Sequence, residues 1–271
     1  MEATNQYAVV TGGTSGIGYE LARLLAKDGY NLILAARGEQ NLIRVSNELK
    51  TEFGIDVIRI SKDLFVPAHA FELYNDIKTK NLSIEILIND AGQGQYGEFL
   101  DTDLQRELDI INLNISSLVI LTKLFLRDMV DQGHGRIMNL SSIASKMPGP
   151  WQSVYHGTKA FVQSFTEAVR SEVKDKGVTI TALLPGATDT DFFNKADMND
   201  SRIVQEGKLD NAADAAKDGY EAMMNGDDMV VSGMKNKMQV AMSNVTPDSA
   251  LADKMKKQQG PAREKKEKQV H

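Results

Sequence analysis

The chain has 271 residues, of which 42% are hydrophobic, with a formal net charge of −6 and an isoelectric point of about 5.3. This length and hydrophobic content suit one large α/β domain, and the negative charge argues against a nucleic-acid-binding surface. Because there is no cysteine, disulfides, thiolate metal sites and cysteine nucleophiles are excluded. The four histidines show no metal-ligand spacing, so no metal site is predicted.

The first residues have neither the basic nor the apolar region of a secretory signal, and no run of 18 apolar residues occurs. We therefore expect a cytoplasmic protein without a membrane span. Residues 253–271 differ in composition, with seven basic and three acidic side chains. Apolar residues become rare there, which predicts a basic, disordered tail after a single domain at 1–252.

Short apolar runs alternate with longer helical patterns along the chain. Strands are predicted at 7–11, 31–35, 57–61, 84–89, 136–140 and 179–184, and helices at 16–28, 39–53, 67–80, 101–131 and 153–176. Several strands are rich in Val and Ile without strict alternation, as strands buried on both faces are. The repeated units predict a doubly wound parallel sheet of the Rossmann type, with about seven strands and helices on both faces. A barrel of eight units would need more strands than the chain supplies.

A glycine-rich turn follows the first strand and opens directly into an amphipathic helix. It reads Thr11-Gly12-Gly13-Thr14-Ser15-Gly16-Ile17-Gly18. Glycines allow the backbone to approach a pyrophosphate, and the helix N-terminus offers free N–H groups to the phosphates. The turn therefore predicts a dinucleotide site. The spacing of its glycines differs from the usual G-x-G-x-x-G.

The second strand ends in Ala36 and Arg37, where an enzyme that uses NAD usually carries an acid for the adenosine ribose. A guanidinium can instead pair with a 2′-phosphate through charge-assisted hydrogen bonds. We therefore predict NADP in preference to NAD.

Tyr155 and Lys159 are four residues apart in a predicted helix, with Ser142 thirteen residues before Tyr155. Positions i and i+4 lie on the same helix face. A free tyrosine has a pKa of about 10, and a nearby cation lowers it toward the range of a useful acid or base. The pair therefore predicts a proton-transfer site, although a solvated helix face gives the same spacing by chance.

Together these motifs resemble the short-chain dehydrogenase/reductase family in its compact single-domain form, over roughly residues 5–195. Further segments carry the resemblance: Asp63 after the third strand, Asn89-Asp90-Ala91-Gly92, Asn112-Leu113-Asn114, Tyr155-His156-Gly157-Thr158-Lys159 and Pro185-Gly186-Ala187-Thr188-Asp189-Thr190. Asp90 departs from the second Asn of the usual Asn-Asn-Ala-Gly stretch. Asn112 is an alternative to Asn114, and Ser141 leaves a one-residue ambiguity that the spacing to Tyr155 decides for Ser142.

The resemblance implies the following roles. The catalytic residues would be Asn114, Ser142, Tyr155 and Lys159. The cofactor would be held by Gly12, Thr14, Ser15, Gly16, Ile17, Gly18, Arg37, Asp63, Asn89, Ala91, Gly92, Tyr155, Lys159, Pro185, Gly186, Thr188 and Thr190. Hydride would pass between the nicotinamide and a carbonyl carbon, with Tyr155 as acid or base and Lys159 lowering its pKa.

The substrate is predicted only as a small carbonyl compound or alcohol. Met147, Pro148, Trp151, Phe192 and Phe193 could line an apolar pocket, and residues 190–210 correspond to the substrate lid of the family. By resemblance, helices 101–131 and 153–176 would join copies into a homodimer or homotetramer. The alternative function is a redox-inactive NADP-binding sensor or scaffold.

Overall fold

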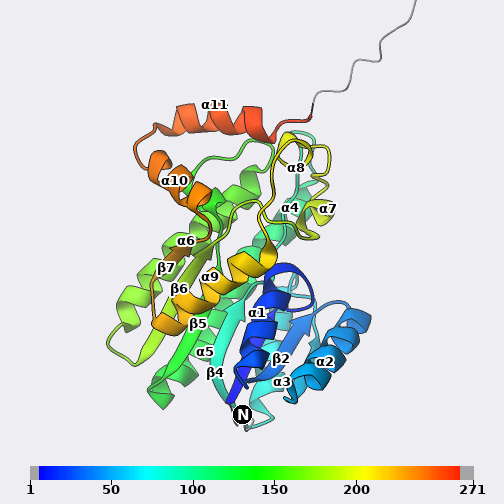
Figure 1. The fold of residues 1–271 in the computed structure, drawn as a ribbon, viewed down its shortest axis with the longest axis vertical. Coiled ribbons are helices and arrows are strands. Elements are labelled where there is room, and N and C mark those ends of the chain that lie inside the picture. The colour runs from blue at the N-terminus through cyan, green and yellow to red at the C-terminus, as the bar shows by residue number, and fades with distance from the viewer. Residues whose placement is uncertain (1–5, 263–271) are drawn as a thin grey trace, which may run out of the picture.

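The computed structural model describes residues 6–262, and in this range a seven-stranded parallel sheet forms the centre of the molecule (Figure 1). The strand order is β3-β2-β1-β4-β5-β6-β7. The strands are β1 (Gln6–Thr11), β2 (Asn31–Ala36), β3 (Val57–Ser61), β4 (Ser83–Asn89), β5 (Gly135–Leu140), β6 (Val178–Leu184) and β7 (Met229–Val231). The predicted Rossmann-type fold is confirmed. The first six strands lie within one residue of their predicted bounds, whereas β7 was not predicted.

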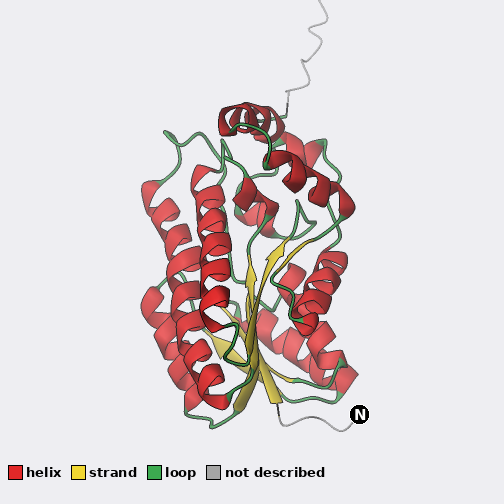
Figure 2. Cartoon of the chain, turned by 90° about the vertical axis from the view of Figure 1, so that its left-hand side faces the viewer, coloured by secondary structure: helices red, strands yellow, loops and turns green. Residues whose placement is uncertain are grey.

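Helices cover both faces of this sheet (Figure 2). One face carries α1 (Gly16–Lys27), α2 (Glu39–Phe53) and α9 (Ala212–Asn225). The other face carries α3 (Pro67–Lys78), α5 (Leu118–Gln132) and α6 (Ser153–Val173). The predicted helices correspond to α1, α2, α3, α5 and α6, whereas α9 was not predicted. Burial on both sides explains why the strands lack strict alternation.

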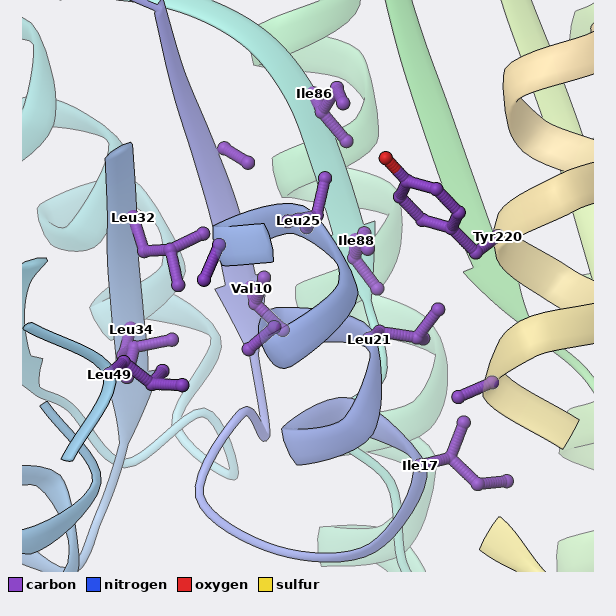
Figure 3. Packing of buried hydrophobic residues seen from close by; sticks show 14 of the residues in the cluster. Val10, Ile17, Leu21, Leu25, Leu32, Leu34, Leu49, Ile86, Ile88 and Tyr220 are labelled. Atoms are coloured by element: carbon purple, nitrogen blue, oxygen red, sulfur yellow. The ribbon is translucent and has the colours of Figure 1, made fainter. Parts of the chain in front are cut away.

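Successive side chains of each strand enter opposite layers of the core. In β1, Val10 packs with the α1 layer and Val9 with the α5 layer. Figure 3 shows the first layer, where Leu21 and Leu25 of α1 and Tyr220 of α9 face the central strands. Each fully buried leucine contributes about 1.5–3 kcal/mol of hydrophobic stabilisation. This packing fixes the carboxyl ends of the strands relative to one another.

The helix predicted at 101–131 is not a uniform α-helix. It consists of α4 (Leu104–Ile111), a π-helical segment η1 (Asn112–Ser117) and α5. Within the described residues, the stretch Leu104–Gln132 alone is long and apolar enough to cross a membrane by length and composition. The same test is passed by core helices, and here Leu121 and Phe125 pack against the sheet.

The C-terminal part of the chain lies above the carboxyl ends of the strands (Figure 1). It contains α7 (Phe192–Lys195), α8 (Arg202–Gln205), α10 (Met234–Ser243) and α11 (Asp248–Gln259). The prediction that a disordered tail starts at residue 253 is wrong for this stretch, because α11 continues to Gln259. Leu251 and Met255 anchor α11 on Met147 in a buried cluster. The rest of the predicted tail, 263–271, lies outside the described residues.

The strand order reverses between β1 and β4. From β1 the sheet is extended on one side by β2 and β3, and from β4 it is extended on the other side by β5, β6 and β7. In open α/β sheets, ligands bind at this switch point, beyond the carboxyl ends of the strands. The fold therefore places the functional site under the C-terminal helices.

Candidate functional site

A single cleft of about 1010 Å³ opens at the switch point. Its walls come from the β1–α1 turn, the ends of β2, β4, β5 and β6, the segment around α7 and α8, and α11. Among the described residues, no cluster of three or more histidine, aspartate or glutamate side chains could hold a metal ion. The cleft is large enough for a dinucleotide together with a second molecule.

The glycine-rich turn makes the floor of the cleft. Gly12 and Gly16 have φ angles of +74° and +58°, in the left-handed region that favours glycine. A Cβ on Gly12 would lie 2.8 Å from the carboxylate of Asp90, and one on Gly16 would lie 3.0 Å from Thr190. Ser15, the residue before α1, makes no capping hydrogen bond with its side chain. The N-terminus of α1 thus offers a tight cradle for a pyrophosphate, as the donor chemistry of a nicotinamide dinucleotide site requires.

Asp90 lies inside this turn, where the usual family motif has asparagine. Its carboxylate accepts a hydrogen bond from the backbone of Gly18, and a Cβ on Gly18 would come within 2.3 Å of it. Burial raises the pKa of Asp90 to about 7, although the positive charge of Lys159 opposes the shift. The substitution therefore keeps a hydrogen-bond acceptor for the turn and adds an ionisable group near Lys159.

Arg37 follows β2 at the far end of the cleft, with its side chain half exposed. Its guanidinium lies over the ring of Phe65 at 4.7 Å and 4.0 Å from the carboxylate of Asp63. Asp63 also accepts a hydrogen bond from the backbone N–H of Phe65. These three residues form a charged and aromatic corner of the cleft. The planar guanidinium of Arg37 can bind a phosphate there.

Ser142 and Ser141 have different partners. The Ser142 hydroxyl accepts a hydrogen bond from the Ala144 N–H and donates to the Pro185 carbonyl at 3.4 Å, and it also bonds to Tyr155. Ser141 instead donates to the Lys159 backbone carbonyl. Ser142 is therefore the serine beside the phenol, as the spacing predicted.

Tyr155 projects from the first turn of α6 into the cleft. Burial raises the pKa of Tyr155 to about 12, and the hydrogen bond with Ser142 lowers it only in part. Burial therefore outweighs the lowering that we expected from the spacing to Lys159, and the pKa of Tyr155 stands above its ordinary value. The Lys159 ammonium lies 5.8 Å from the centre of the phenol ring and donates to the Leu140 carbonyl at 2.7 Å.

Lys159 and Asn114 meet at Gly92. A Cβ on Gly92 would lie 3.4 Å from Lys159 Nζ and 3.3 Å from Asn114 Oδ1, so a larger residue would crowd both side chains. Burial lowers the pKa of Lys159 to about 8, while the charge of Asp90 raises it. Lys159 can therefore change protonation state close to neutral pH.

Asn114 lies in η1, and it is fully buried behind the cleft. Its amide donates to the Gln93 carbonyl and to the Thr158 hydroxyl, and its oxygen accepts from the Gln93 N–H. Asn112 instead accepts from Ser116 on the helix itself. The structure thus favours Asn114 over Asn112. A π-helical segment commonly marks a functional position, because the extra residue reorients a side chain.

Of all the predicted catalytic and cofactor residues, three do not line the cleft: Gly18, Asn89 and Asn114. Asn89 lies in the sheet, where it donates to Thr122 and Asn139 and joins β4 to β5. Gly18 contacts Asp90. Thr188 and Thr190 reach the cleft from the loop after β6.

The substrate side is largely built by residues that the sequence analysis missed. Gln259 of α11 bonds to the ring of His156 at 2.9 Å, and that ring bonds on its other side to the Met147 carbonyl. Burial lowers the pKa of His156. Met255 also lines the cleft. The i, i+4 spacing of Leu251 and Met255 was the available signal for a packed helix.

Three of the five predicted pocket residues line the cleft: Met147, Phe192 and Phe193. Phe192 packs against Tyr155, with ring centroids 5.0 Å apart. Trp151 stacks on Tyr96 outside the lining, with φ at +72°. Phe192 thus covers the Tyr155 phenol ring in the cleft.

The family model for short chain dehydrogenases matches residues 6–201. Very-long-chain 3-oxoacyl-CoA reductases are among the similar proteins. The match to that of Rattus norvegicus is 36% identical over 189 residues, or 66% of this chain and 58% of that protein. The match to the Homo sapiens protein is 38% identical over 186 residues, and it also covers 66% of this chain and 58% of that protein. The chain therefore spans less than two thirds of the length of these relatives.

An uncharacterised oxidoreductase of Staphylococcus epidermidis is 28% identical over 208 residues, which cover 77% of this chain and 87% of that protein. Among solved structures, a short-chain dehydrogenase from Sphingobium yanoikuyae in complex with NADPH superposes with a TM-score of 0.79. It is 25% identical, and the match covers 89% of this chain and 96% of the other. L-sorbose reductase from Gluconobacter frateurii shares the fold, with a TM-score of 0.74 at 22% identity over 86% of this chain and 98% of that one.

Proposed function

Because the chain belongs to the short-chain dehydrogenase family, we propose that it interconverts a carbonyl and an alcohol by hydride transfer, with NADP(H) as cofactor. The observation that carries the proposal is the convergence of Ser142, Tyr155 and Lys159 beside the glycine-rich cradle. A reduced nicotinamide bound in that cradle would supply the hydride. The residues of the chain would bind, orient and protonate the substrate.

Tyr155 is suited to act as the proton donor in carbonyl reduction. A phenol with a pKa raised to about 12 is protonated at neutral pH. As negative charge develops on the carbonyl oxygen, Tyr155 would transfer its proton and Ser142 would hydrogen-bond the same oxygen. Protonated Lys159 would stabilise the phenolate that remains, and Asn114 would hold the neighbouring backbone of Gln93.

NADP is the proposed cofactor because Arg37 stands at the end of β2 in place of an acid. Its guanidinium, held against Phe65, would pair with the 2′-phosphate. Asp63 would lie next to the adenine.

The proposed substrate is a 3-oxoacyl thioester, the class named for the Rattus norvegicus and Homo sapiens relatives. The cleft offers an apolar wall for an acyl chain and lysines at its mouth for a phosphorylated carrier. The wall is formed by Ile143, Met147, Phe193, Met198, Ile203 and Met255, and the lysines are Lys208, Lys235 and Lys257.

We also propose a homodimer or homotetramer. Large apolar side chains are exposed near α4 and on α6: Phe99, Leu100, Leu104, Leu108 and Phe161. A second copy of the chain that covers these residues would remove apolar surface from water.

The test is NADPH oxidation with a 3-oxoacyl thioester by wild type and by Tyr155→Phe. The variant removes one hydroxyl, and we expect kcat/KM to fall about 10²- to 10⁴-fold, the range for a lost acid or base. NADPH binding, followed by fluorescence titration, should remain. A matched control is Tyr220→Phe, which removes a hydroxyl bonded to Asp28 far from the cleft. Undiminished turnover in Tyr155→Phe would refute the role of this residue.

A further inference from the structure

Gln152 is a buried amide beside Tyr155 that the proposed reaction does not use. It precedes α6, lines the cleft and is 4% exposed. Its backbone bonds to Gly149 and His156 and closes the turn into the helix. Its side-chain Nε2 has no hydrogen-bond partner among the described residues. Burying an unpaired donor costs about 1–3 kcal/mol, so a bound molecule that pairs with this nitrogen would remove that cost.

Gly94 shows where the unpaired donor lies relative to the reactive phenol. A Cβ on Gly94 would be 3.3 Å from Gln152 Nε2, 3.4 Å from Tyr155 Cδ2 and 2.9 Å from Phe192 Cζ. The donor and the phenol ring therefore flank one point, and the ring of Phe192 closes over it. Since Phe192 belongs to the short helix α7, a displacement of α7 by an entering molecule would uncover both groups together.

The other two buried glutamines of the cleft, Gln259 and Gln93, each make a side-chain hydrogen bond. Gln259 shares a hydrogen bond with His156, and the Gln93 side chain accepts from Arg106. Gln259 also has a buried atom without a partner, its acceptor Oε1, but of these three glutamines only Gln152 leaves a buried donor nitrogen without a partner in the described chain. A donor in this position can pair with an acceptor on a molecule bound beside the Tyr155 ring.

We propose that Gln152 Nε2 donates a hydrogen bond to a second carbonyl oxygen of the substrate, on the carbon two bonds away from the carbonyl that is reduced. A 3-oxoacyl thioester carries that oxygen on its thioester carbon. A simple ketone lacks the oxygen and leaves the donor unpaired. Gln152 therefore selects 1,3-dicarbonyl compounds over monoketones. This inference rests on the proposed function, because it assigns a specificity residue to the same site.

The experiment compares two substrates of equal chain length, a 3-oxoacyl N-acetylcysteamine thioester and a ketone without the thioester group. Gln152→Met removes the donor at similar size, and Gln152→Glu replaces the amide nitrogen by an acceptor. One neutral hydrogen bond is worth about 1 kcal/mol, and its loss costs more where the acceptor is left unpaired. We therefore expect kcat/KM for the thioester to fall about tenfold. The ketone should change by less than about twofold, so the ratio of the two reports specificity.

Gln163→Met is the matched control. Gln163 is a buried amide on the same helix, bonded to Glu167 and to Met229 away from the cleft. It should lower thermal stability without altering the substrate ratio. An equal loss on both substrates, or no loss on either, in Gln152→Met and Gln152→Glu would overturn the assignment of Gln152 while leaving the proposed function intact. If the wild type oxidises NADPH with neither substrate, both are overturned.

Discussion

The half of the cleft that would hold the cofactor and the half that would hold the substrate are built differently. The cofactor half is made of short turns at strand ends, where glycines and neighbouring polar side chains act within a few residues of each other. The substrate half is assembled from segments far apart in the chain, such as Met147, α7 and α11. Local chemistry therefore specifies the first half, and long-range packing specifies the second.

The strongest test of this division is to detach α11. Met255 is buried against Met147 and Leu251, so Met255→Asp would place a carboxylate in an apolar cluster and release the helix. We expect kcat/KM for the thioester to fall about a hundredfold, equivalent to about 3 kcal/mol, because one wall of the substrate half is lost. The NADPH dissociation constant should change less than about twofold, since the glycine-rich turn and Arg37 lie on elements other than α11.

Met242→Asp is the control for that variant, because Met242 is exposed on α10. It should leave both measurements unchanged. A parallel loss of NADPH affinity in Met255→Asp would show that the two halves are not independent.

A second variant acts on the cofactor half alone. Arg37→Ala removes the guanidinium at the end of β2, and charge-assisted hydrogen bonds worth about 1.5–3 kcal/mol correspond to a ten- to hundredfold weaker binding of NADPH. NADH lacks the 2′-phosphate, so its affinity should not fall. Arg44→Ala on α2, which removes an exposed arginine paired with Glu48, is the control. Equal affinity of the wild type for NADPH and NADH would contradict the proposed role of Arg37.

The smallest effect concerns Asp90, which stands where the family motif has its second asparagine and lies against the glycine-rich turn. The folded protein raises the pKa of Asp90 to about 7, so between about pH 4 and about pH 7 the folded state binds more protons than the unfolded state. The contribution of Asp90 to the free energy of unfolding therefore falls as the pH rises through this window. Asp90→Asn should make stability less dependent on pH there. Urea denaturation at several pH values measures this, and an unchanged pH slope would contradict the assignment.

These contrasts also explain what could be predicted from the sequence. Six strands and Tyr155 were predicted because periodicity and motif spacing are local signals. β7 was missed because it has three residues, and its pairing with β6 depends on the completed sheet. Residues 253–259 of α11 fall in the predicted tail, because the helix is polar and has only two buried apolar residues, Leu251 and Met255. Their contact with Met147 is remote in sequence.

The chemistry of the site shows the same limit. Asn114 was predicted, but the π-helical segment that aims it could not be, because its extra residue is accommodated by packing. The pKa of Tyr155 was expected to fall from the spacing to Lys159 alone. In the folded chain, burial dominates and raises it. The sequence spacing of Tyr155 and Lys159 predicts that they lie close together, whereas the burial and orientation of their side chains depend on the whole fold.

The central proposal is that a 3-oxoacyl thioester receives hydride from the nicotinamide at its 3-carbonyl carbon and a proton from Tyr155 on the carbonyl oxygen. Its most direct test is a single turnover of wild type with NADPH deuterated at the transferable position of the nicotinamide, followed by mass spectrometry of the product. We predict a 3-hydroxyacyl thioester that carries one deuterium on the carbinol carbon, and no such product with Tyr155→Phe on the same timescale. Tight NADPH binding without any labelled product in the wild type would contradict the claim.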